Sequence, residues 1–453
     1  MTSSFDHDLE KAISGLEQQE PEKTQAGSVQ DSAEESSPLQ SSRRVALAGA
    51  LGLGTGVAAT LAGHYAASGQ QEETEASSST PALQEAKVPF YGPRQAGIDT
   101  PAPSYGVFIA LNLNSGLERE GIRRLLTILT DDAARLTAGR APITDQEPEL
   151  ADVAANLTVT FGFGERIFDI VAPQKKPSWL KPLPAFEQID QLQDQWSGGD
   201  LLLQICSSDR FTLAHAQRVL LKDCRSFASV HWVQEGFRRA YGSEREGSTM
   251  RNLFGQVDGT INPSNSDGSM ESYVWGQQEE LTPWEEGGTS LVIRRIHMNL
   301  DSWDQADRPA REDAIGRKLS NGAPLTGSQE RDPADLSATN ELGFPVIAPY
   351  AHIRRAAAQN RVEQILRRGY NYDLPVQAAS GFSEGGQISG GVSSSGLIFC
   401  SYQADPIQQF LPIQQRLADL DMLNTWTVPI GSAVFALPAG ARPGSFVGEG
   451  LFS

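Results

Sequence analysis

Apolar and polar positions divide the chain into a polar N-terminal stretch and a globular part that begins near residue 86. Residues 105–114, YGVFIALNLN, form a nearly continuous apolar run typical of a buried strand. Residues 116–139 repeat apolar positions at helical spacing, with Ile122, Leu125, Leu126 and Leu129 on one face. The same reasoning predicts strands at 105–114, 157–164, 200–209 and 227–237, and helices at 116–139 and 210–224.

A second set of elements repeats this order after residue 288. Blocks 198–220 and 394–417 both run through Gly or Ser, an apolar strand, an Asp and an amphipathic helix. The predicted elements are strands at 288–300, 396–405 and 431–440, and helices at 309–322, closed by Gly322, and 406–421. We therefore predict an α+β fold of two ferredoxin-like halves, a duplicated antiparallel-sheet sandwich, with halves at 86–262 and 263–453.

The N-terminal stretch has three parts. Residues 1–40 are rich in Ser, Gln and Glu, which predicts a disordered tail. Residues 41–67 place Arg43 and Arg44 before a weakly apolar Gly/Ala-rich run, which resembles a twin-arginine export signal. An uncleaved anchor and an ordinary secretory signal are the alternatives. Residues 68–85 are predicted to be a linker, so we expect export by the twin-arginine machinery to the periplasm or the cell exterior.

Composition and motif content exclude several classes of partner and of functional site. The formal net charge of −19 argues against nucleic acid as a partner. Three widely spaced cysteines give no readable disulfide framework, and the six histidines form no paired zinc or copper motif. No phosphate-binding loop and no nucleophile elbow is present.

Two residues remain as candidates. Asp258 lies in the Gly-rich stretch NLFGQVDGTINP (252–263), where an Asp-Gly turn is the plain alternative. His352, in PYAHIRRAAAQN, is a single imidazole without companions, which suits a haem iron better than a bare metal ion. A structural histidine before a helix is the alternative there.

With further motifs, these residues carry a family resemblance. The chain resembles the dye-decolorizing (DyP-type) haem peroxidases, in the twin-arginine-exported deferrochelatase/peroxidase branch, over nearly all of residues 88–450. The matching stretches include LTVTFGFG, RNLFGQVDGTINP, IGRKLSNGAPLTG, AHIRRA and ILRRGYNYD. Two departures are Arg94, where a histidine is common, and Ala357-Ala358, where an Asn-Pro pair is usual.

The resemblance implies roles for particular residues, with non-covalent haem b bound mainly by the C-terminal half. His352 would be the axial ligand of the haem iron, Asp258 the distal acid–base residue and Arg367 the distal arginine. Because the segment between His352 and the arginine pair is short, Arg368 is the alternative to Arg367. Gly259, Thr260 and Ile261, which follow the aspartate, would line the haem.

Two further residues, Asp405 and Arg294, each have a candidate role and stated alternatives. Asp405 is the candidate acceptor for the second ring nitrogen of His352, with a helix N-cap as its alternative. Strand alternation puts Arg294 on an apolar face, where a haem propionate, an internal carboxylate or a solvent-reaching stem would each explain the charge.

The leading hypothesis is a peroxidase that uses hydrogen peroxide to oxidise small aromatic donors: phenols, dye-like molecules or porphyrins. The alternative is a haem-binding or iron-acquisition protein, whose partners would be iron-uptake components. A haemless binding module is the third hypothesis, and a homo-oligomer is left open. A carrier needs His352 but has no use for both Asp258 and Arg367, so their joint presence favours the enzyme.

Overall fold

The computed structural model describes residues 82–245, 247–281, 284, 286–376 and 393–453. The predicted tail at 1–40, the signal segment at 41–67 and most of the linker at 68–85 lie outside these residues. In the part of the chain that is described, no helix has the length and apolar character needed to cross a membrane.

The N-terminal half is an antiparallel sheet in the order β2-β3-β1-β4, with two long helices on one face. Its elements are β1 (Tyr105–Leu113), α2 (Arg119–Thr137), β2 (Thr158–Phe163), α3 (Glu165–Val171), β3 (Leu201–Ser207), α4 (Arg210–Cys224) and β4 (Ala228–Phe237). Helix α4 begins where predicted, because the Asp209 side chain accepts the backbone N–H of Thr212 at 2.8 Å.

The C-terminal half repeats this arrangement, with sheet order β9-β5-β8 and the short strands β6 and β7 along the other edge of β8. Its elements are β5 (Thr289–Met298), α5 (Leu300–Trp303), α6 (Arg308–Ile315), α7 (His352–Arg355), β6 (Leu366–Arg367), β7 (Tyr370–Asp373), β8 (Ser395–Gln403), α8 (Phe410–Leu420) and β9 (Thr427–Leu437). Single helical turns lie at Leu83–Glu85, Pro148–Ala151, Pro173–Lys175, Asp194–Trp196, Met270–Val274, Met422–Thr425 and Glu449–Phe452. The predicted pair of ferredoxin-like halves is confirmed.

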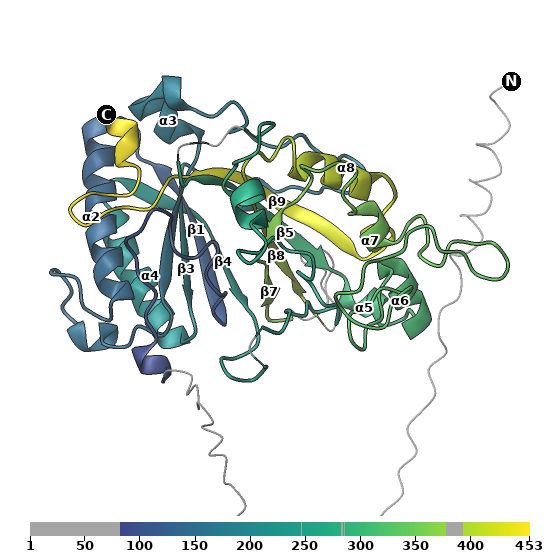
Figure 1. Cartoon of the computed structure of the whole chain (residues 1–453). Coiled ribbons are helices and arrows are strands. Elements are labelled where there is room, and N and C mark those ends of the chain that lie inside the picture. The colour runs from purple at the N-terminus through teal and green to yellow at the C-terminus, as the bar shows by residue number, and fades with distance from the viewer. Residues whose placement is uncertain (1–81, 246, 282–283, 285, 377–392) are drawn as a thin grey trace, which may run out of the picture. The chain divides into compact units, whose positions relative to one another are not determined.

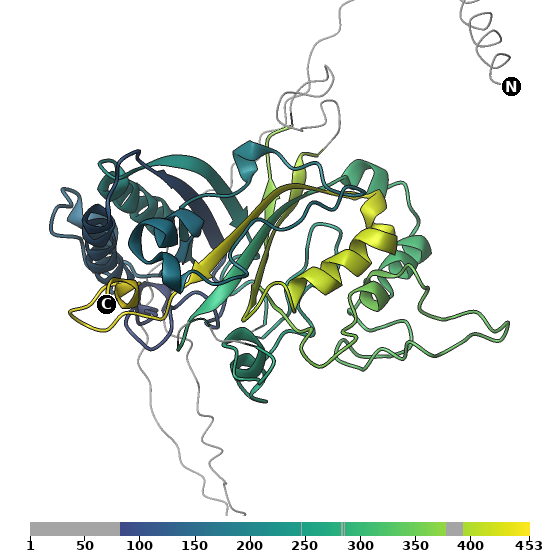
Figure 2. The same ribbon diagram turned by 90° about the horizontal axis from the view of Figure 1, so that it is seen from above.

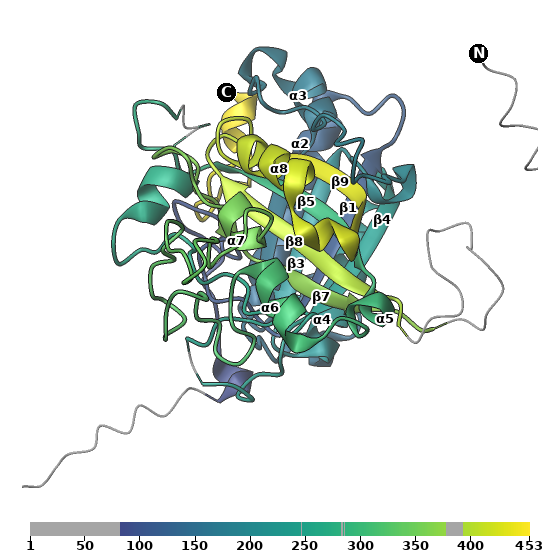
Figure 3. The ribbon, with the colours of Figure 1, turned by 90° about the vertical axis from the view of Figure 1, so that its right-hand side faces the viewer.

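The two sheets pack face to face and join at both edges. One residue pair, Phe163 with Ala436, links β2 to β9, and another, Phe237 with Asn371, links β4 to β7. Figures 1 and 2 show the resulting layers: α2 and α4 on one side, the two sheets in the middle, and α8 on the other side. Figure 3 shows α5, α6 and α7 on that same side as α8, in front of the C-terminal sheet.

The layers are held together by two large apolar cores. The first lies between the helices α2 and α4 and the N-terminal sheet, and includes Leu125, Leu129 and Ile109. The second fills the space between the sheets, and draws on both halves, with Phe108 from β1 and Phe435 from β9. Successive residues of β1 therefore alternate between the two cores, as the period of a strand requires.

Three details differ from the predicted elements. Helix α6 ends at Gly316 and not at Gly322, because Gly316 takes a left-handed conformation (φ 85°) and its N–H closes on the carbonyl of Glu312 at 2.8 Å. Helix α8 begins at Phe410, after a turn at 406–409. Strands β6 and β7 were not predicted, since two and four residues are too few to show a period.

Candidate active site

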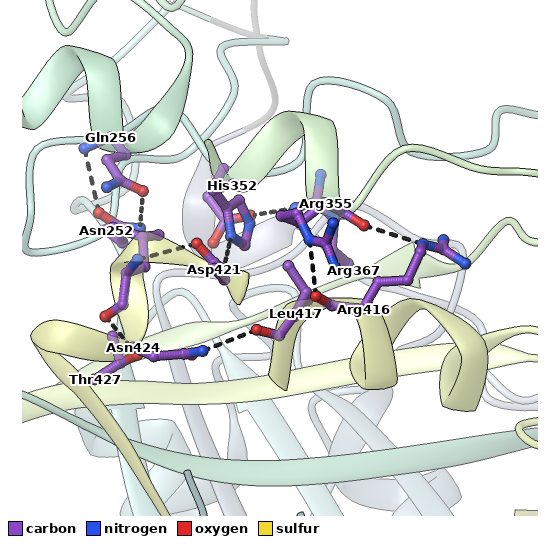
Figure 4. Close-up of polar contacts among 12 residues, drawn as sticks. Asn252, Gln256, His352, Arg355, Arg367, Arg416, Leu417, Asp421, Asn424 and Thr427 are labelled. Atoms are coloured by element: carbon purple, nitrogen blue, oxygen red, sulfur yellow. Dashed lines mark hydrogen bonds and ion pairs between the residues drawn. The ribbon is translucent and has the colours of Figure 1, made fainter. Parts of the chain in front are cut away.

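His352 is the first residue of α7, and Asp421 fixes its ring. The Nδ1 atom of His352 lies 2.6 Å from Oδ2 of Asp421, as Figure 4 shows. The other oxygen of Asp421 accepts the backbone N–H of Leu423 at 3.0 Å, and its side chain is only 4% exposed. A carboxylate on Nδ1 leaves Nε2 as the atom available to a metal, and Nε2 has no hydrogen-bond partner in the described part of the chain.

The electrostatic surroundings of His352 tie it to the other candidate residues. Burial by itself would lower the pKa of His352, but the carboxylate of Asp421 outweighs burial, so that the pKa is raised. Arg367 and Asp258 also act on this ring, the arginine lowering its pKa and the aspartate raising it. His352, Asp258 and Arg367 therefore share one site, although 94 residues separate the first two in sequence (352 minus 258).

The predicted role of Asp405 is wrong, because Asp421 takes the position beside His352. Asp405 instead accepts the backbone N–H groups of Ile407 (2.8 Å) and Gln408 (3.2 Å), and so caps the turn that precedes α8. This matches the alternative considered for it, a cap. Sequence reasoning missed Asp421, whose cap position before the turn Met422–Thr425 was the only local signal.

Asp258 is held by a tightly bonded loop. Its N–H donates to the carbonyl of Met250 at 2.8 Å, and the Arg251 guanidinium bonds the carbonyls of Gly255, Leu319 and Ser320. The Asn252 side chain accepts two further backbone N–H groups within the loop. The loop thus presents the carboxylate in one orientation.

Asp258 and Arg367 form an ion pair. Nη1 of Arg367 lies 3.0 Å from Oδ1 of Asp258, and the side chains are 26% and 19% exposed. Asn262 positions the arginine, because its side-chain amide donates to the backbone carbonyl of Arg367 at 2.7 Å and accepts its N–H at 3.0 Å. No sequence motif singled out Asn262, yet it links the aspartate loop to strand β6.

Strand geometry separates Arg367 from Arg368. Leu366, Arg368 and Tyr370 are buried on the inner face of the C-terminal sheet, so Arg367 projects from the opposite face. Arg368 bonds the carbonyls of Thr100 and Pro101 in the N-terminal half. Of the two arginines, only Arg367 contacts Asp258 in the described structure.

The three residues after Asp258 have different surroundings. Gly259 has φ 117°, in the region that favours glycine. The hydroxyl of Thr260 donates to Oε1 of Glu330 at 3.0 Å, and Thr249 donates to the same oxygen at 2.6 Å. Ile261 is 72% exposed. Their predicted place along the haem stays a prediction.

Arg294 forms an ion pair with an internal carboxylate, which was one of the three explanations considered for its charge. Its guanidinium bonds Asp190, and the two side chains are 1% and 3% exposed. Burial lowers the pKa of Arg294, while the carboxylate opposes that effect. Asp190 neutralises this buried charge, which matches the internal-carboxylate alternative, and the contact of Arg294 with a haem propionate stays a prediction.

The donor set of the site fits haem better than a bare metal ion. No group of three or more His, Cys, Asp or Glu side chains that could hold a metal occurs among the described residues. Haem iron needs a single axial imidazole, because the porphyrin supplies the other ligands. His352, oriented by Asp421 and close enough to Asp258 and Arg367 for their charges to act on its pKa, meets that requirement.

Two family models match most of the described chain. The model described as Dyp-type peroxidase, N-terminal, matches residues 95–238, and that described as Dyp-type peroxidase, C-terminal, matches residues 249–442. The second match contains His352, Asp258 and Arg367.

Two relatives that are similar to this chain in sequence have names that agree with the family models. A dye-decolorizing peroxidase of Thermobifida fusca is 36% identical over 79% of this chain and 83% of its own length. A deferrochelatase of Escherichia coli (strain K12) is 32% identical over 84% of this chain and 91% of its own.

Solved structures agree as well. The crystal structure of a DyP-type peroxidase from Cellulomonas bogoriensis superposes with a TM-score of 0.76 at 48% identity, covering 82% of this chain and 99% of that one. Ferric DtpA from Streptomyces lividans gives a TM-score of 0.73 at 35% identity, covering 82% and 98%. The chain therefore belongs to the Dyp-type peroxidase family.

Proposed function

We propose that Asp258, Arg367 and His352 form the active site of a peroxidase that holds haem b without a covalent bond. Family membership makes the chain a haem-dependent peroxidase, an oxidoreductase that acts on hydrogen peroxide. The observation that carries the residue assignment is the ion pair between Asp258 and Arg367, on the same site as the His352 imidazole that Asp421 orients.

Each residue has a distinct task in this proposal. His352 would hold the iron through Nε2, while Asp421 keeps the ring in that orientation. Bound haem supplies the redox chemistry that peroxide reduction needs. Asp258 would take the proton from the near oxygen of peroxide and deliver it to the far oxygen, which leaves as water. The guanidinium of Arg367 would stabilise the negative charge that develops on the departing oxygen.

The donors and the location are further parts of the proposal. Two one-electron donors complete each turnover, and the net charge of −19 favours neutral or cationic phenols over anionic dyes. Arg43 and Arg44 before the Gly/Ala-rich run support export by the twin-arginine route to the periplasm or beyond. Iron-uptake components would be partners only if iron release were the main activity, whereas a homo-oligomer is compatible with either activity.

Iron release from haem is the second candidate function. It is favoured by one observation, the name deferrochelatase carried by relatives 32% identical to this chain. A protein that only released iron would need His352 to bind haem, but it would not need both Asp258 and Arg367.

The experiment measures haem retention, peroxide-dependent oxidation of a neutral phenol, and iron release on the same preparations. His352→Ala should lose haem. Asp258→Asn should keep haem but lose about 10²- to 10⁴-fold in turnover, the usual contribution of a general acid–base group. Asp267→Asn, at an exposed loop position, is the matched control and should behave as wild type. Full turnover in Asp258→Asn would contradict the assignment, and iron release without phenol oxidation in the wild type would favour the second function.

A further inference from the structure

A cavity of about 350 Å³ borders the candidate active site at strand β6, because Asn262 and Arg367 are among the residues that line it. Its walls come from the loops around residues 98–102 and 262–265, from Arg238 at the end of β4, and from residues 366–368. Arg368 and Leu366 face the interior between the sheets, whereas Arg367 projects toward Asp258. Arg368 and Arg367 therefore leave strand β6 on opposite faces, and Arg367 belongs both to the cavity lining and to the candidate active site.

The cavity concentrates positive charge in an acidic protein. Three arginines, Arg238, Arg367 and Arg368, are among its lining residues, against one acidic residue, Asp99. Arg367 is paired with Asp258, but neither Arg238 nor Arg368 forms an ion pair with any residue that the structure describes. Such a concave positive patch attracts anions despite the overall charge of −19.

Of the two arginines without an ion pair, Arg368 is buried and Arg238 is half-buried. Arg368 is 5% exposed, and its Nε has no hydrogen-bond partner within the described residues. Arg238 donates from Nε to the carbonyl of Gly369 at 2.9 Å and stacks over the Tyr370 ring, 4.9 Å from its centroid. Burial lowers the pKa of Arg238, and the nearby Arg368 lowers it further. Arg368 also donates to the backbone carbonyls of Thr100 and Pro101, which are neutral, so an anionic ligand would stabilise both cations.

The rest of the lining is apolar and favours an organic anion over an inorganic one. Ile98, Met270 and Leu366 are buried side chains on the cavity wall, next to Ala102 and Pro263. A carboxylate matches the planar fork of a guanidinium, and an apolar body matches these walls. We propose that this cavity binds a small organic carboxylate, with its carboxylate on Arg238 and Arg368 and its apolar body against Ile98 and Met270.

The proposed carboxylate position on Arg238 and Arg368 would be distinct from the haem site, although Arg367 borders both, because Arg368 points away from the face on which Asp258 and Arg367 meet. The rival occupant is one of the carboxylates of haem itself. The haem-loaded protein distinguishes these two occupants. A haem carboxylate would already fill the cavity there, whereas a cavity that binds a separate carboxylate would remain open.

The test is calorimetric titration of benzoate into the haem-loaded protein. Benzoate should bind, and Arg238→Gln should weaken binding by about 10-fold or more, the usual loss for a hydrogen bond to a charged group. Arg239→Gln is the matched control, since Arg239 is the neighbour of Arg238 in sequence, does not line the cavity and is paired with Glu244. Ala102→Phe fills the cavity without removing a charge, and should abolish binding while the haem spectrum stays unchanged.

Three results would overturn the proposal. Benzoate that binds only the haem-free protein would assign the cavity to a haem carboxylate. Equal affinity for inorganic phosphate and benzoate would remove the organic specificity. Unchanged binding in Ala102→Phe, with haem still loaded, would place the benzoate elsewhere.

Discussion

At His352 one carboxylate decides which ring nitrogen is free to bind a metal. Asp421 bonds Nδ1 at 2.6 Å, and its second oxygen is occupied by the backbone of Leu423. The imidazole is therefore polarised as well as oriented, which raises the basicity of Nε2. A negative partner of this kind stabilises the more oxidised state of a bound iron.

Replacing Asp421 by Asn should weaken haem retention by about 10- to 100-fold, as loss of such a partner does at other metal sites. It should also raise the reduction potential of the bound iron, because the negative charge beside His352 is lost. Spectroelectrochemical titration and haem transfer to an acceptor protein measure the two effects. Asp405→Asn is the control, since Asp405 only caps a turn; an equal shift in that variant would show that the effect is not specific to the partner of His352.

Residues of the candidate site could be predicted from the sequence only where they belong to a recognisable motif. Asp258, His352 and Arg367 were chosen from local motifs, and the structure brings them into one site. Asp421 and Asn262 were missed, because their partners lie 69 and 105 residues away and nothing local indicates such contacts. Arg294 was placed on the correct kind of buried face, but its partner Asp190 lies in an irregular segment that no periodicity describes.

At the scale of elements, the end of α6 positions the helix that carries His352. Gly316 ends α6 with φ 85°, and a Cβ there would lie 2.7 Å from Cγ1 of Ile353, the residue after His352. The sequence analysis predicted that the helix ends at Gly322, because the pattern of polar and apolar residues continues up to that glycine. Residues 317 and 324 instead pair as an isolated bridge, so the chain turns back six residues earlier than predicted (322 minus 316).

Gly316→Ala should therefore lower the free energy of unfolding and loosen haem binding. Gly343→Ala is the matched control, because Gly343 has φ 83° but no atom within 4 Å of a Cβ. Backbone strain is common to both variants, at about 1–2 kcal/mol. The clash with Ile353 should add about 1–3 kcal/mol in Gly316→Ala. Denaturant unfolding checks this, and equal losses in the two variants would mean that the contact with Ile353 does not matter.

Helices α2 and α4 carry a pair of acids that makes stability depend on pH. Burial, followed by the negative charge of Asp132, raises the pKa of Asp223 from 3.8 to about 7. Burial also raises the pKa of Asp132. The folded state thus binds more protons than the unfolded state between these values, so stability falls as the pH rises from about 4 to about 7.

Asp223→Asn should raise the melting temperature above about pH 7, where the wild type carries the charge at a cost, and should give little gain near pH 4. Thermal unfolding at both pH values measures the difference. Asp131→Asn, on the exposed side of α2 and bonded to Arg135, should not show this pattern. A gain of equal size at both pH values would contradict the raised pKa of Asp223.

At the scale of the whole described molecule, the two halves depend on one another. Their sheets meet through a common core and through single residue pairs at both edges. The repeat in the sequence was enough to predict two related halves, since each carries its own strand and helix periods. The way in which they face each other was not predictable, because fully buried strands such as β3 show no alternation that marks one face.

A cavity in the N-terminal half should therefore release haem from the C-terminal half. Phe108 is fully buried between the sheets, and Phe108→Ala should cost about 3–5 kcal/mol. Unfolding and haem release should occur in one transition at a lower temperature. Phe211→Ala, 63% exposed on α4, should change stability by no more than about 0.5 kcal/mol. Haem release that stays at the wild-type temperature in Phe108→Ala would show that the halves unfold independently.

The measurement that tests the central claim most directly is the rate at which haem-loaded protein reacts with equimolar peroxide. It is followed by rapid-mixing absorption for the wild type, Asp258→Asn, Arg367→Gln and the double variant. If Asp258 and Arg367 act as one unit, each single change slows the reaction strongly and the double variant is little slower than the worse single one. A wild-type rate in Asp258→Asn, or fully additive losses in the double variant, would contradict the account.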